Sequence, residues 1–546
     1  MACAVAQQLI VGFSDTEDIA RESHRDLSFR ESPLIYLSFA QIRVEKPCSR
    51  FHADLPLRQQ HCRRNGNELE MMQSKYAPVT PNVVAALEQI VGARNVIFAD
   101  NERMVDYSHD EIPSAGYTHM PDVVVKPASA AEISEIMKLA NRERIPVTPR
   151  GAGSGLSGGA VPVLGGILLS VERMNHILEV DSENLVITVE PGVVTNTIND
   201  AVQDLGLFYA GYPMSLEVCF IGGNVAENAG GGRAIKYGVT SRYVMGLEVV
   251  LPTGEIVQMG GKRVKDVTGY DMIHLMVGSE GTLGIFTKII LRLTPQPVAR
   301  AVLLVPFPDV SSAIGVVPRI MTQGRIIPSS VEFIDRDAAE IGYAYAGEPL
   351  PHKDMGAMLL LEVDAYSQAQ AETEYTSMVE LCEQAGALDM YVGDTPAKIK
   401  KMWHPRQVIA DALKNITNEQ SGEDLVVPLS HIPAFVAELA RLAHKYNVRM
   451  PVFGHAADGN LHVHVIRRPE NQTEDWSVLL PRVLEEVYRV VAGFGGTISG
   501  EHGIGFKRIR YLSIFLDPTM IALQRRIKQA FDPLDILNPG KIFPVE

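Results

Sequence analysis

Hydrophobic and polar residues alternate along this chain in two different periods, which predicts both helices and strands. Apolar residues have helical spacing over residues 83–91 and 130–140, and Ser129 precedes the second run as an N-cap. Glycine-rich turns separate short β-branched runs at residues 123–125, 145–149, 166–171, 185–190, 247–251 and 287–293. The pattern therefore predicts an α+β region with a mixed sheet.

A second region of the same kind begins at about residue 300. Residues 301–305 and 356–363 have the composition of strands, and residues 367–385 and 396–413 have helical spacing. Beyond them we expect helices at 433–446 and 473–492, a strand within 448–464, and a turn-rich tail at 531–541. These patterns predict one two-layer domain over residues 298–430 and a C-terminal segment, 431–546, that completes it.

Size and charge limit the classes of protein to consider. With 546 residues the chain is too long for one hydrophobic core, so two or three domains are expected. The formal net charge of −15 argues against nucleic acid or an anionic membrane as a partner. No run of about 18 apolar residues is present, so we expect no transmembrane segment. A cytoplasmic protein that reaches a membrane only through a partner is predicted.

The five cysteines and the N-terminal segment add two further expectations. No cysteine pair has CxxC spacing, which argues against an iron–sulfur cluster or a thiolate zinc site, and the odd number fits a reducing compartment. Residues 1–75 lack a sustained apolar period and mix acids with bases, unlike a signal or transit peptide. We expect this extension to be poorly ordered, and Met71 and Met72 leave open a natural start near them.

A glycine-rich run follows the strand expected at residues 145–149. It reads Arg150-Gly151-Ala152-Gly153-Ser154-Gly155-Leu156-Ser157-Gly158-Gly159. Glycine permits positive φ and lets backbone N–H groups approach a pyrophosphate closely. The run is not a P-loop, because no Gly-Lys-Ser/Thr follows, and Pro162 with Gly165 and Gly166 argues against a helix after it. A tight structural loop is the alternative interpretation.

Two further glycine clusters favour a nucleotide site over ordinary turns. Residues 221–232 read Ile-Gly-Gly-Asn-Val-Ala-Glu-Asn-Ala-Gly-Gly-Gly, and residues 278–285 read Gly-Ser-Glu-Gly-Thr-Leu-Gly-Ile. Three loops that expose backbone donors within so short a span exceed what chain reversal needs. We therefore expect a dinucleotide site built from all three.

Histidines and a carboxylate are concentrated near the C-terminus. They lie in Gly454-His455-Ala456-Ala457-Asp458-Gly459-Asn460-Leu461-His462 and in Gly500-Glu501-His502-Gly503. Alternation along a strand places His462 and His464 on one face. Imidazole and carboxylate suit zinc, manganese or iron(II), and three protein ligands leave positions open for a substrate. Any one of these histidines, taken alone, is more often structural than a ligand.

The order of the glycine motifs resembles the FAD-binding domain of the vanillyl-alcohol-oxidase/PCMH flavoproteins. Residues 81–546 are similar to the glycolate oxidase catalytic subunit and to the D-lactate and D-2-hydroxyglutarate dehydrogenases. The resemblance implies a two-subdomain PCMH-type FAD-binding domain over residues 81–297, with its core at 121–297. It also implies a ferredoxin-like α+β cap domain and a closing C-terminal segment.

The resemblance implies that the glycine motifs and one C-terminal asparagine hold FAD. These residues are Arg150, Gly151, Gly153, Ser154, Gly155, Leu156, Gly158, Gly159, Gly222, Gly223, Asn224, Asn228, Gly230, Gly231, Glu280, Gly281, Ile285 and Asn538. Some members of the superfamily attach flavin covalently through a histidine in the first glycine loop. No histidine or cysteine lies between Arg150 and Gly166, so we expect non-covalent FAD.

The resemblance also implies a metal site and the catalytic groups. It makes His455, His462 and Glu501 the ligands of a divalent ion, with zinc expected and manganese or iron as alternatives. It makes His502 the general base on the substrate hydroxyl, whereas a hydrogen bond to a ligand is the alternative. Arg406 occupies the position that binds the substrate carboxylate, and a surface arginine at a helix start is the alternative.

Several positions depart from the family pattern. Ala457 stands where relatives usually carry glycine, and His464 stands where related dehydrogenases often have a substrate-contacting asparagine. His464 could therefore add a ligand or change the substrate preference. Ala410 replaces a threonine of the 2-hydroxyglutarate-type members, and residues 422–424 (Gly-Glu-Asp) replace their lysine region. We expect an acidic loop there to repel a second carboxylate, which favours glycolate or D-lactate.

The expected function is FAD-dependent oxidation of a small D-2-hydroxy acid to the 2-keto acid. The proton goes to His502 and a hydride to the flavin. The electrons then pass to an external acceptor, such as an iron–sulfur partner subunit, an electron-transfer flavoprotein, quinone or oxygen. A flavin oxidase of another alcohol and a non-catalytic FAD-binding subunit of a larger complex are the alternatives.

Overall fold

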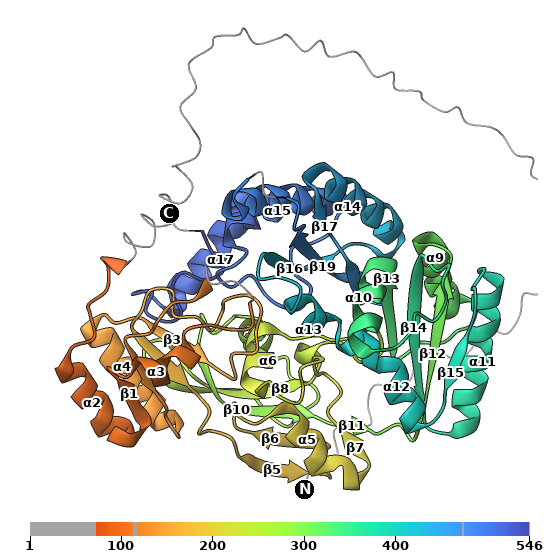
Figure 1. The fold of residues 1–546 in the computed structure, drawn as a ribbon. Coiled ribbons are helices and arrows are strands. Elements are labelled where there is room, and N and C mark those ends of the chain that lie inside the picture. Colours follow the sequence, from red (N-terminus) through yellow and green to blue (C-terminus); the bar gives the residue numbers. More distant parts are fainter. Residues whose placement is uncertain (1–72, 113–116, 472–473, 545–546) are drawn as a thin grey trace, which may run out of the picture. The chain divides into compact units, whose positions relative to one another are not determined.

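The computed structural model describes residues 73–112, 117–471 and 474–544 (Figure 1). The expectation about residues 1–75 therefore lies outside the described residues, apart from the last three. Within the described ranges, three sheets and a two-stranded ribbon organise the chain.

The first sheet contains β1 (Val96–Phe98), β2 (Val123–Val125), β3 (Val147–Arg150) and β4 (Ile167–Ser170). Its order is β1–β2–β4–β3, parallel except for β1 with β2. The Ser129 hydroxyl accepts a hydrogen bond from the Glu132 N–H at 3.2 Å, which confirms the predicted N-cap. The accompanying helices are α2 (Pro81–Val91), η1 (Ala93–Asn95), α3 (Asn101–Met104), η2 (Val105–Tyr107) and α4 (Ala130–Glu143).

The second sheet is antiparallel throughout. Its strands are β5 (Ile177–Asp181), β6 (Val186–Val189), β8 (Val244–Val250), β9 (Ile256–Gly260) and β10 (Ile285–Arg292), in the order β5–β6–β10–β8–β9. Apolar side chains of β6 and β8 share one core with those of two helices, α5 (Thr195–Val202) and α6 (Ile221–Glu227). The other elements of this region are α7 (Ala234–Tyr237), α8 (Met272–Met276), η4 (Gln203–Leu205), η5 (Thr240–Arg242), and the ribbon of β7 (Leu207–Phe208) with β11 (Thr294–Pro295).

The third sheet has eight strands, all paired antiparallel. They are β12 (Ala299–Phe307), β13 (Ser330–Asp335), β14 (Ala357–Ala365), β15 (Tyr391–Gly393), β16 (Gln420–Val426), β17 (Val448–Arg449), β18 (Val452–His455) and β19 (Asn460–Arg467). Their order is β15–β12–β14–β13–β18–β19–β16, and β17 also pairs with β19.

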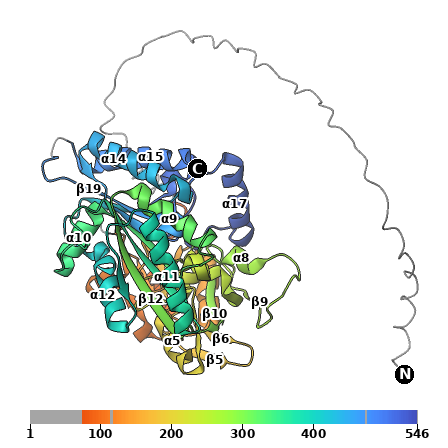
Figure 2. The same ribbon diagram turned by 90° about the vertical axis from the view of Figure 1, so that its right-hand side faces the viewer.

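Helices cover both faces of the third sheet. Leu303 and Val305 of β12 point to one core, and Val302 and Leu304 point to the other, because successive side chains alternate. Figure 2 shows α9 and α11 over β12. The first face is covered by α9 (Val310–Thr322), α11 (Gln368–Gln384), α14 (Ile432–Tyr446) and α15 (Trp476–Gly493), and the second by α10 (Arg336–Ala346), α12 (Pro396–Gln407) and α13 (Ile409–Lys414).

The C-terminal residues return to the first sheet. Leu537 forms a parallel β-bridge with Val147, and Ile536 and Leu537 are buried in the core of that sheet. Lys528 holds this turn by donating to the Leu537 carbonyl at 2.7 Å and to the Asp532 carboxylate at 2.5 Å. The remaining elements are η6 (Leu429–His431), η7 (Ala456–Asp458), η8 (Ile509–Tyr511), α16 (Leu512–Phe515) and α17 (Pro518–Phe531).

The α+β interpretation is confirmed, whereas three local predictions are wrong. Residues 396–413 form two helices, because Pro405 removes a donor from the last turn of α12 and the helix ends at Gln407. Gly222 and Gly223 lie in α6 and not in a loop. Residues 422–424 lie in β16 and not in an acidic loop. The domain boundary predicted at residue 430 stays a prediction. The third sheet contains strands from both sides of that residue.

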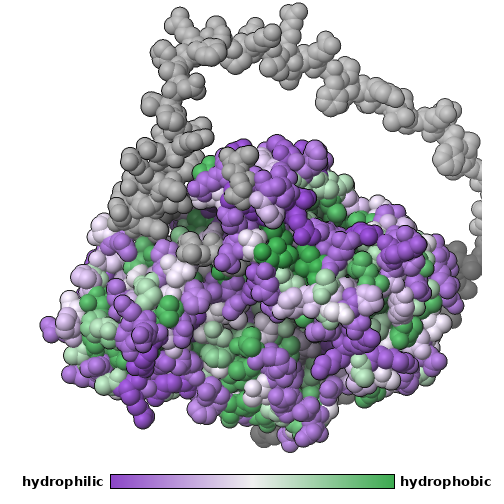
Figure 3. Space-filling model, in the orientation of Figure 1, coloured by the Kyte–Doolittle hydropathy of each residue, from purple (hydrophilic) through white to green (hydrophobic). Residues whose placement is uncertain are grey.

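No helix in the described part of the chain is both long and apolar enough to span a membrane. Figure 3 shows that hydrophilic residues cover much of the face in view and that apolar residues are scattered among them.

Candidate functional site

The first glycine run forms a loop after β3, and no helix follows it before β4, as predicted. The Arg150 guanidinium donates to the backbone carbonyls of His109 at 2.7 Å and Asp106 at 3.0 Å. Gly153 has a φ of 76°, and a Cβ there would overlap the same guanidinium. Arg150 therefore fixes the shape of the loop through its side chain.

A cavity lies between this loop, α6 and the start of β10. Of the residues predicted to bind FAD, its lining includes Arg150, Gly151, Gly159, Gly222, Gly223, Glu280, Gly281 and Ile285. Sequence reasoning missed Pro149, Ala160, Val171, Pro191, Ala226, Glu227, Gly284 and Phe286. Several of these residues are next to a predicted glycine in the sequence. That proximity was the signal that could have identified them as lining residues.

Other predicted FAD residues do not line this cavity. Asn224 donates to the Thr195 hydroxyl at 2.7 Å, and Asn538 donates to the Gly159 carbonyl at 3.0 Å and the Glu280 carbonyl at 2.8 Å. These bonds hold the walls together, and contact with FAD stays a prediction for this group. The group consists of Gly153, Ser154, Gly155, Leu156, Gly158, Asn224, Asn228, Gly230, Gly231 and Asn538.

Gly223 indicates that the cavity fits a ligand. It lies in α6 with an ordinary φ, and no atom of the described protein comes within 4 Å of the position a Cβ would take. Glycine within a helix costs about 0.5–1 kcal/mol relative to alanine. Since neither packing nor backbone conformation requires glycine here, the space suits a molecule that approaches the backbone closely. A dinucleotide such as FAD has this property.

His455, His462 and Glu501 converge beside this cavity. His455 ends β18 and His462 lies on the neighbouring β19, while Glu501 comes from the loop after α15. The Nε2 atoms of His455 and His462 lie 3.2 Å and 3.1 Å from Glu501 Oε1. One donor atom from each residue lies within 4.8 Å of the others. Two imidazole nitrogens and a carboxylate oxygen form a donor set that fits a divalent metal ion.

Glu332 of β13 orients this cluster, and sequence reasoning missed it. Its Oε1 lies 2.6 Å from His455 Nδ1, and its Oε2 accepts a hydrogen bond from Arg406 Nε at 2.8 Å. Burial opposes ionisation of Glu332, but Arg406 and His455 lower its pKa to about 2. An ionised carboxylate can only accept, so Nδ1 of His455 carries a proton that it donates to Glu332. Glu332 and Glu501 raise the pKa of His455 well above its usual value despite burial. Because Nδ1 is engaged, Nε2 is the ring atom that could bind a metal ion.

Arg406 lies where Glu332 and an aromatic ring enclose it. It is buried in the last turn of α12, and its guanidinium lies 4.7 Å from the centre of the Phe453 ring. The interpretation as a surface arginine at a helix start is therefore wrong. Nε donates to Glu332, and Nη2 lies 2.6 Å from the same carboxylate oxygen but has no hydrogen-bond partner among the described residues. The donors other than Nε could therefore bind a substrate carboxylate.

Asp424 of β16 fixes the loop that carries Glu501 and His502. Its Oδ2 accepts hydrogen bonds from the Ser499 hydroxyl at 2.7 Å and from the three N–H groups of residues 500–502 at 2.9 Å each. Its Oδ1 accepts from Asn460 Nδ2 at 2.6 Å. Burial and Glu501 oppose ionisation of Asp424, but the nearby His502, His462 and Arg508 lower its pKa. The carboxylate therefore positions the ligand loop as an anion.

Glu423, the other acid of the expected acidic loop, is also fully engaged. It is buried, lies 3.0 Å from Lys507 Nζ, and accepts a hydrogen bond from the Tyr488 hydroxyl. Both acids are buried in β16 and engaged within the protein, so the exposed acidic loop on which the argument for a monocarboxylate rests is absent. At Glu332, a lone acid between the apolar residues of a strand was the signal for a buried partner.

His502 and His464 flank the cluster differently. The His502 ring lies 5.5 Å from the His462 ring, and burial lowers its pKa although Asp424 and Glu501 oppose the shift. His464 stacks on Phe453, and burial lowers its pKa to about 3. His462 and His464 both contact Phe453, which confirms that they share a face. His464 does not belong to the group of three converging ligands.

The cluster lies against the glycine segment that follows α6. A Cβ on Gly232 would lie 2.5 Å from Glu332 Oε1 and 3.3 Å from His455 Nδ1. A Cβ on Gly230 would lie 3.5 Å from Glu501 Oε2. Added side chains at these glycines would therefore press on the cluster itself.

Glu280 joins the cavity wall to the loop of His502. Its carboxylate accepts hydrogen bonds from the N–H groups of Ile504 at 2.8 Å and Gly505 at 2.6 Å. Because Glu280 also lines the cavity, it links the cavity wall to the loop that carries Glu501 and His502.

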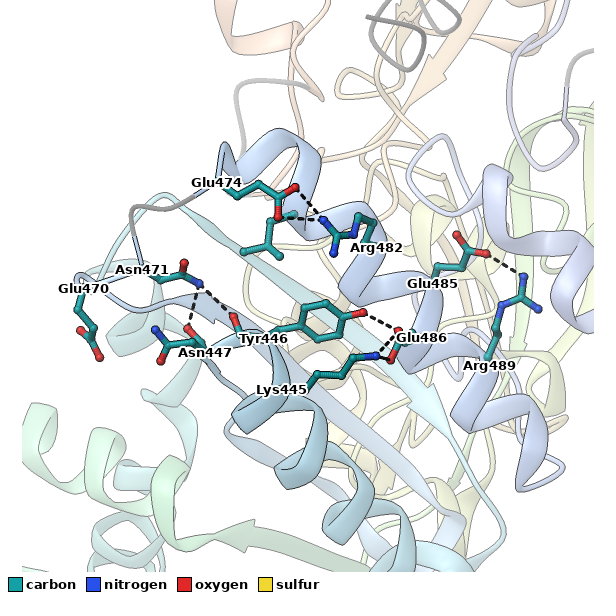
Figure 4. A pocket seen from close by; sticks show the side chains of 11 residues that line it. Lys445, Tyr446, Asn447, Glu470, Asn471, Glu474, Arg482, Glu485, Glu486 and Arg489 are labelled. Atoms are coloured by element: carbon teal, nitrogen blue, oxygen red, sulfur yellow. Dashed lines mark hydrogen bonds and ion pairs between the residues drawn. The ribbon is translucent and has the colours of Figure 1, made fainter. Parts of the chain in front are cut away.

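A second hollow lies at the surface between α14 and α15 and contains none of the predicted site residues. Figure 4 shows that its charged side chains pair across it, as Lys445 does with Glu486 at 2.6 Å and Arg482 with Glu474 at 2.8 Å. These pairs leave little polar capacity for a ligand.

Comparison with known proteins assigns the family. Residues 121–260 match a model described as FAD binding domain, and residues 296–542 match one described as FAD linked oxidases, C-terminal domain. The chain is 39% identical over 467 residues to the glycolate oxidase subunit GlcD of Bacillus subtilis (strain 168), covering 85% of this chain and 97% of the relative. This chain belongs to the FAD-linked oxidase family.

A second relative and a solved structure agree with this assignment. The FAD-linked oxidase chain is 37% identical over 477 residues to a D-lactate dehydrogenase of Anaerostipes hadrus, covering 86% of this chain and 99% of the relative. The crystal structure of p-cresol methylhydroxylase with substrate bound matches with a TM-score of 0.69 at 19% identity, covering 84% of this chain and 96% of the other. At that identity the match establishes the fold, which is the PCMH-type fold expected from the sequence.

Proposed function

We propose that this FAD-linked oxidase is a dehydrogenase that converts a small D-2-hydroxy acid, glycolate or D-lactate, to its 2-keto acid. The observation that carries the proposal is the position of His455, His462 and Glu501 beside the glycine-lined cavity. The family membership, and relatives named for glycolate and D-lactate, support it.

The donor set supports a metal-assisted reaction. When bound, FAD supplies a two-electron acceptor, and a divalent ion supplies positive charge that lowers the pKa of the substrate hydroxyl. His455, His462 and Glu501 would hold the ion and leave positions open for the substrate. We infer zinc from this donor set, with manganese or iron(II) as the other ions that such ligands suit.

His502 acts as the general base in this proposal. It accepts the hydroxyl proton while the hydrogen on the α-carbon leaves with its electron pair. Its backbone is fixed by Asp424 and its ring lies next to His462, so the base and a metal ligand face the same small volume. Arg406 binds the substrate carboxylate through the donors that Glu332 leaves free.

The electrons must leave the protein, since none of the five cysteines has the spacing of an iron–sulfur site. We propose an external acceptor: an iron–sulfur partner subunit, an electron-transfer flavoprotein or a quinone. The choice of glycolate or D-lactate now depends on the named relatives alone, because Glu423 and Asp424 are engaged within the protein.

An anaerobic substrate panel tests the proposal. FAD-loaded protein is mixed with glycolate, D-lactate, L-lactate and D-2-hydroxyglutarate, and bleaching of the flavin absorbance is followed. We expect glycolate or D-lactate to bleach the flavin, a chelator to abolish bleaching, and added zinc to restore it. Bleaching that survives complete metal removal would contradict the metal site. No bleaching by any of these acids would contradict the proposed substrate class.

A further inference from the structure

One acid on the cavity wall has no role in the reaction described above. Glu227 ends α6 and lines the cavity. Its Oε2 atom is shielded from solvent and has no hydrogen-bond partner among the described residues. A buried polar atom without a partner costs about 1–3 kcal/mol. Such an atom beside a ligand cavity indicates that the ligand provides the partner.

Two glycines leave room for this carboxyl group. A Cβ on Gly159 would lie 2.9 Å from Glu227 Oε1, and a Cβ on Gly503 would overlap Oε2. Gly503 follows His502 directly and has a φ of 76°. Glu227 therefore lies between the first glycine run and the loop of the proposed base.

Glu227 and Glu280 differ in the hydrogen bonds that they accept and in their protonation. Glu280 accepts two backbone hydrogen bonds, from Ile504 and Gly505, which favour its anion. Glu227 has no such donors, and burial followed by the charge of Glu280 raises its pKa well above the usual value. Asp110 acts in the same direction, whereas Arg508 and the Ser157 side chain oppose it. Burial also raises the pKa of Glu280, but its two N–H donors oppose that shift. Glu227, which lacks such donors, is therefore the acid of the two that keeps a proton, and a protonated carboxyl group can donate a hydrogen bond.

We propose that Glu227 is a neutral acid that donates a hydrogen bond to an acceptor atom of the isoalloxazine ring of bound FAD. This inference rests on the FAD binding in the proposed function. The ring has carbonyl oxygens and ring nitrogens as acceptors, and hydrogen bonds to them tune its electronics. Reduction places more electron density on these atoms, so the bond strengthens on reduction and keeps the reduction potential high.

Three variants test the assignment. Glu227→Met removes the donor at similar side-chain volume, Glu227→Gln keeps a neutral donor, and Glu248→Gln changes a glutamate of β8 that does not line the cavity. Titration with FAD measures the dissociation constant. Chemical or electrochemical reduction, without any hydroxy acid, measures the flavin midpoint potential.

We expect Glu227→Met to weaken binding of reduced FAD about tenfold relative to oxidised FAD. For a two-electron couple this lowers the midpoint potential by about 30 mV. Glu227→Gln and Glu248→Gln should stay within about threefold of the native ratio. An unchanged potential in Glu227→Met would overturn the proposal, and so would a weaker FAD affinity without a change of potential, which indicates a bond to the ribityl or pyrophosphate part.

A vibrational measurement keeps the test open if Glu227→Met does not fold. The reduced-minus-oxidised infrared difference spectrum should contain a shifted C=O band of a protonated carboxyl group, and Glu227→Gln should lose it. Absence of this band from the native protein would overturn the proposal. A chain that takes up no FAD would overturn the proposed function as well, whereas FAD uptake with an unshifted potential contradicts the role of Glu227 alone.

Discussion

The two halves of the site are built in opposite ways. The FAD cavity is shaped by side chains that are missing, as at Gly223, where nothing in the described protein would meet a Cβ. The histidine cluster is shaped by buried charged side chains, with Glu332 behind His455 and Asp424 behind the ligand loop. The first half should therefore fail when atoms are added, and the second half when charges are removed.

The largest effect is expected from removing the proposed base, His502, beside the histidine cluster. His502→Ala should slow flavin reduction by the substrate about 10²–10⁴-fold, the range for loss of a general base. FAD content should not change, because His502 does not line the cavity. Anaerobic stopped-flow absorbance measures the rate.

The matched control is His274→Ala, an exposed histidine of α8 that pairs with Asp271. This variant should reduce its flavin at the native rate. A native rate in His502→Ala would remove the base assignment and leave the cluster with a structural role.

A second effect comes from the carboxylate that holds the ligand loop. In Asp424→Asn the charge is lost, and the amide offers one acceptor oxygen where Asp424 uses two, so either the Asn460 amide or the N–H groups of residues 500–502 lose their acceptor. Loss of such a supporting group typically weakens metal affinity about 10–100-fold. Competition with a chelator of known affinity measures the change.

Asp335→Asn is the control for burial of an aspartate in the same sheet. Asp335 caps α10 by accepting from the Ala338 N–H at 2.8 Å and also accepts from the Val452 N–H at 3.0 Å. This variant should lower the free energy of unfolding and leave the metal affinity unchanged. Equal weakening of metal binding in both variants would mean that general destabilisation, and not the position of the ligand loop, is responsible.

In the FAD cavity, one added methyl group should weaken FAD binding and at the same time raise the stability of the protein without FAD. Gly223→Ala should weaken FAD binding at least about tenfold, since a Cβ would occupy the space of the ligand. Without FAD the same variant should be up to about 1 kcal/mol more stable, because alanine is the better helix former. Fluorescence titration with FAD and thermal unfolding with and without FAD measure the two quantities.

Gly315→Ala in α9 is the matched control, since a Cβ there also meets no atom within 4 Å and the residue lies outside the cavity. It should gain the same stability with native FAD affinity. If Gly223→Ala bound FAD as the native protein does, the empty space at Gly223 would have no connection with the cofactor.

This contrast also explains how much the sequence could predict. The glycine runs and the two histidine motifs stand out because each is local, and the resemblance to the family then implies His455, His462 and Glu501 as the ligand set. Glu332 and Asp424 were missed as partners because they come from other strands, with 123 residues between Glu332 and His455 along the chain. Acids within β16 suggested an exposed loop, and only the distant Lys507, Tyr488 and N–H groups explain their burial.

The smallest effect is expected from a surface ion pair that joins the segment before the first glycine run to a helix on the third sheet. Lys414 of α13 lies 2.8 Å from Glu111, which precedes the first glycine run, and both side chains are more than a third exposed. Solvent screens such a pair, so a double-mutant cycle of Lys414→Ala and Glu111→Ala should give a coupling energy of about 0.2–1 kcal/mol. Thermal unfolding of the four proteins measures it, and flavin reduction should proceed at the native rate in each. A coupling of several kcal/mol would mean that this contact, and not the buried pair of Arg233 with Glu362 at 2.7 Å, joins the cavity half to the third sheet.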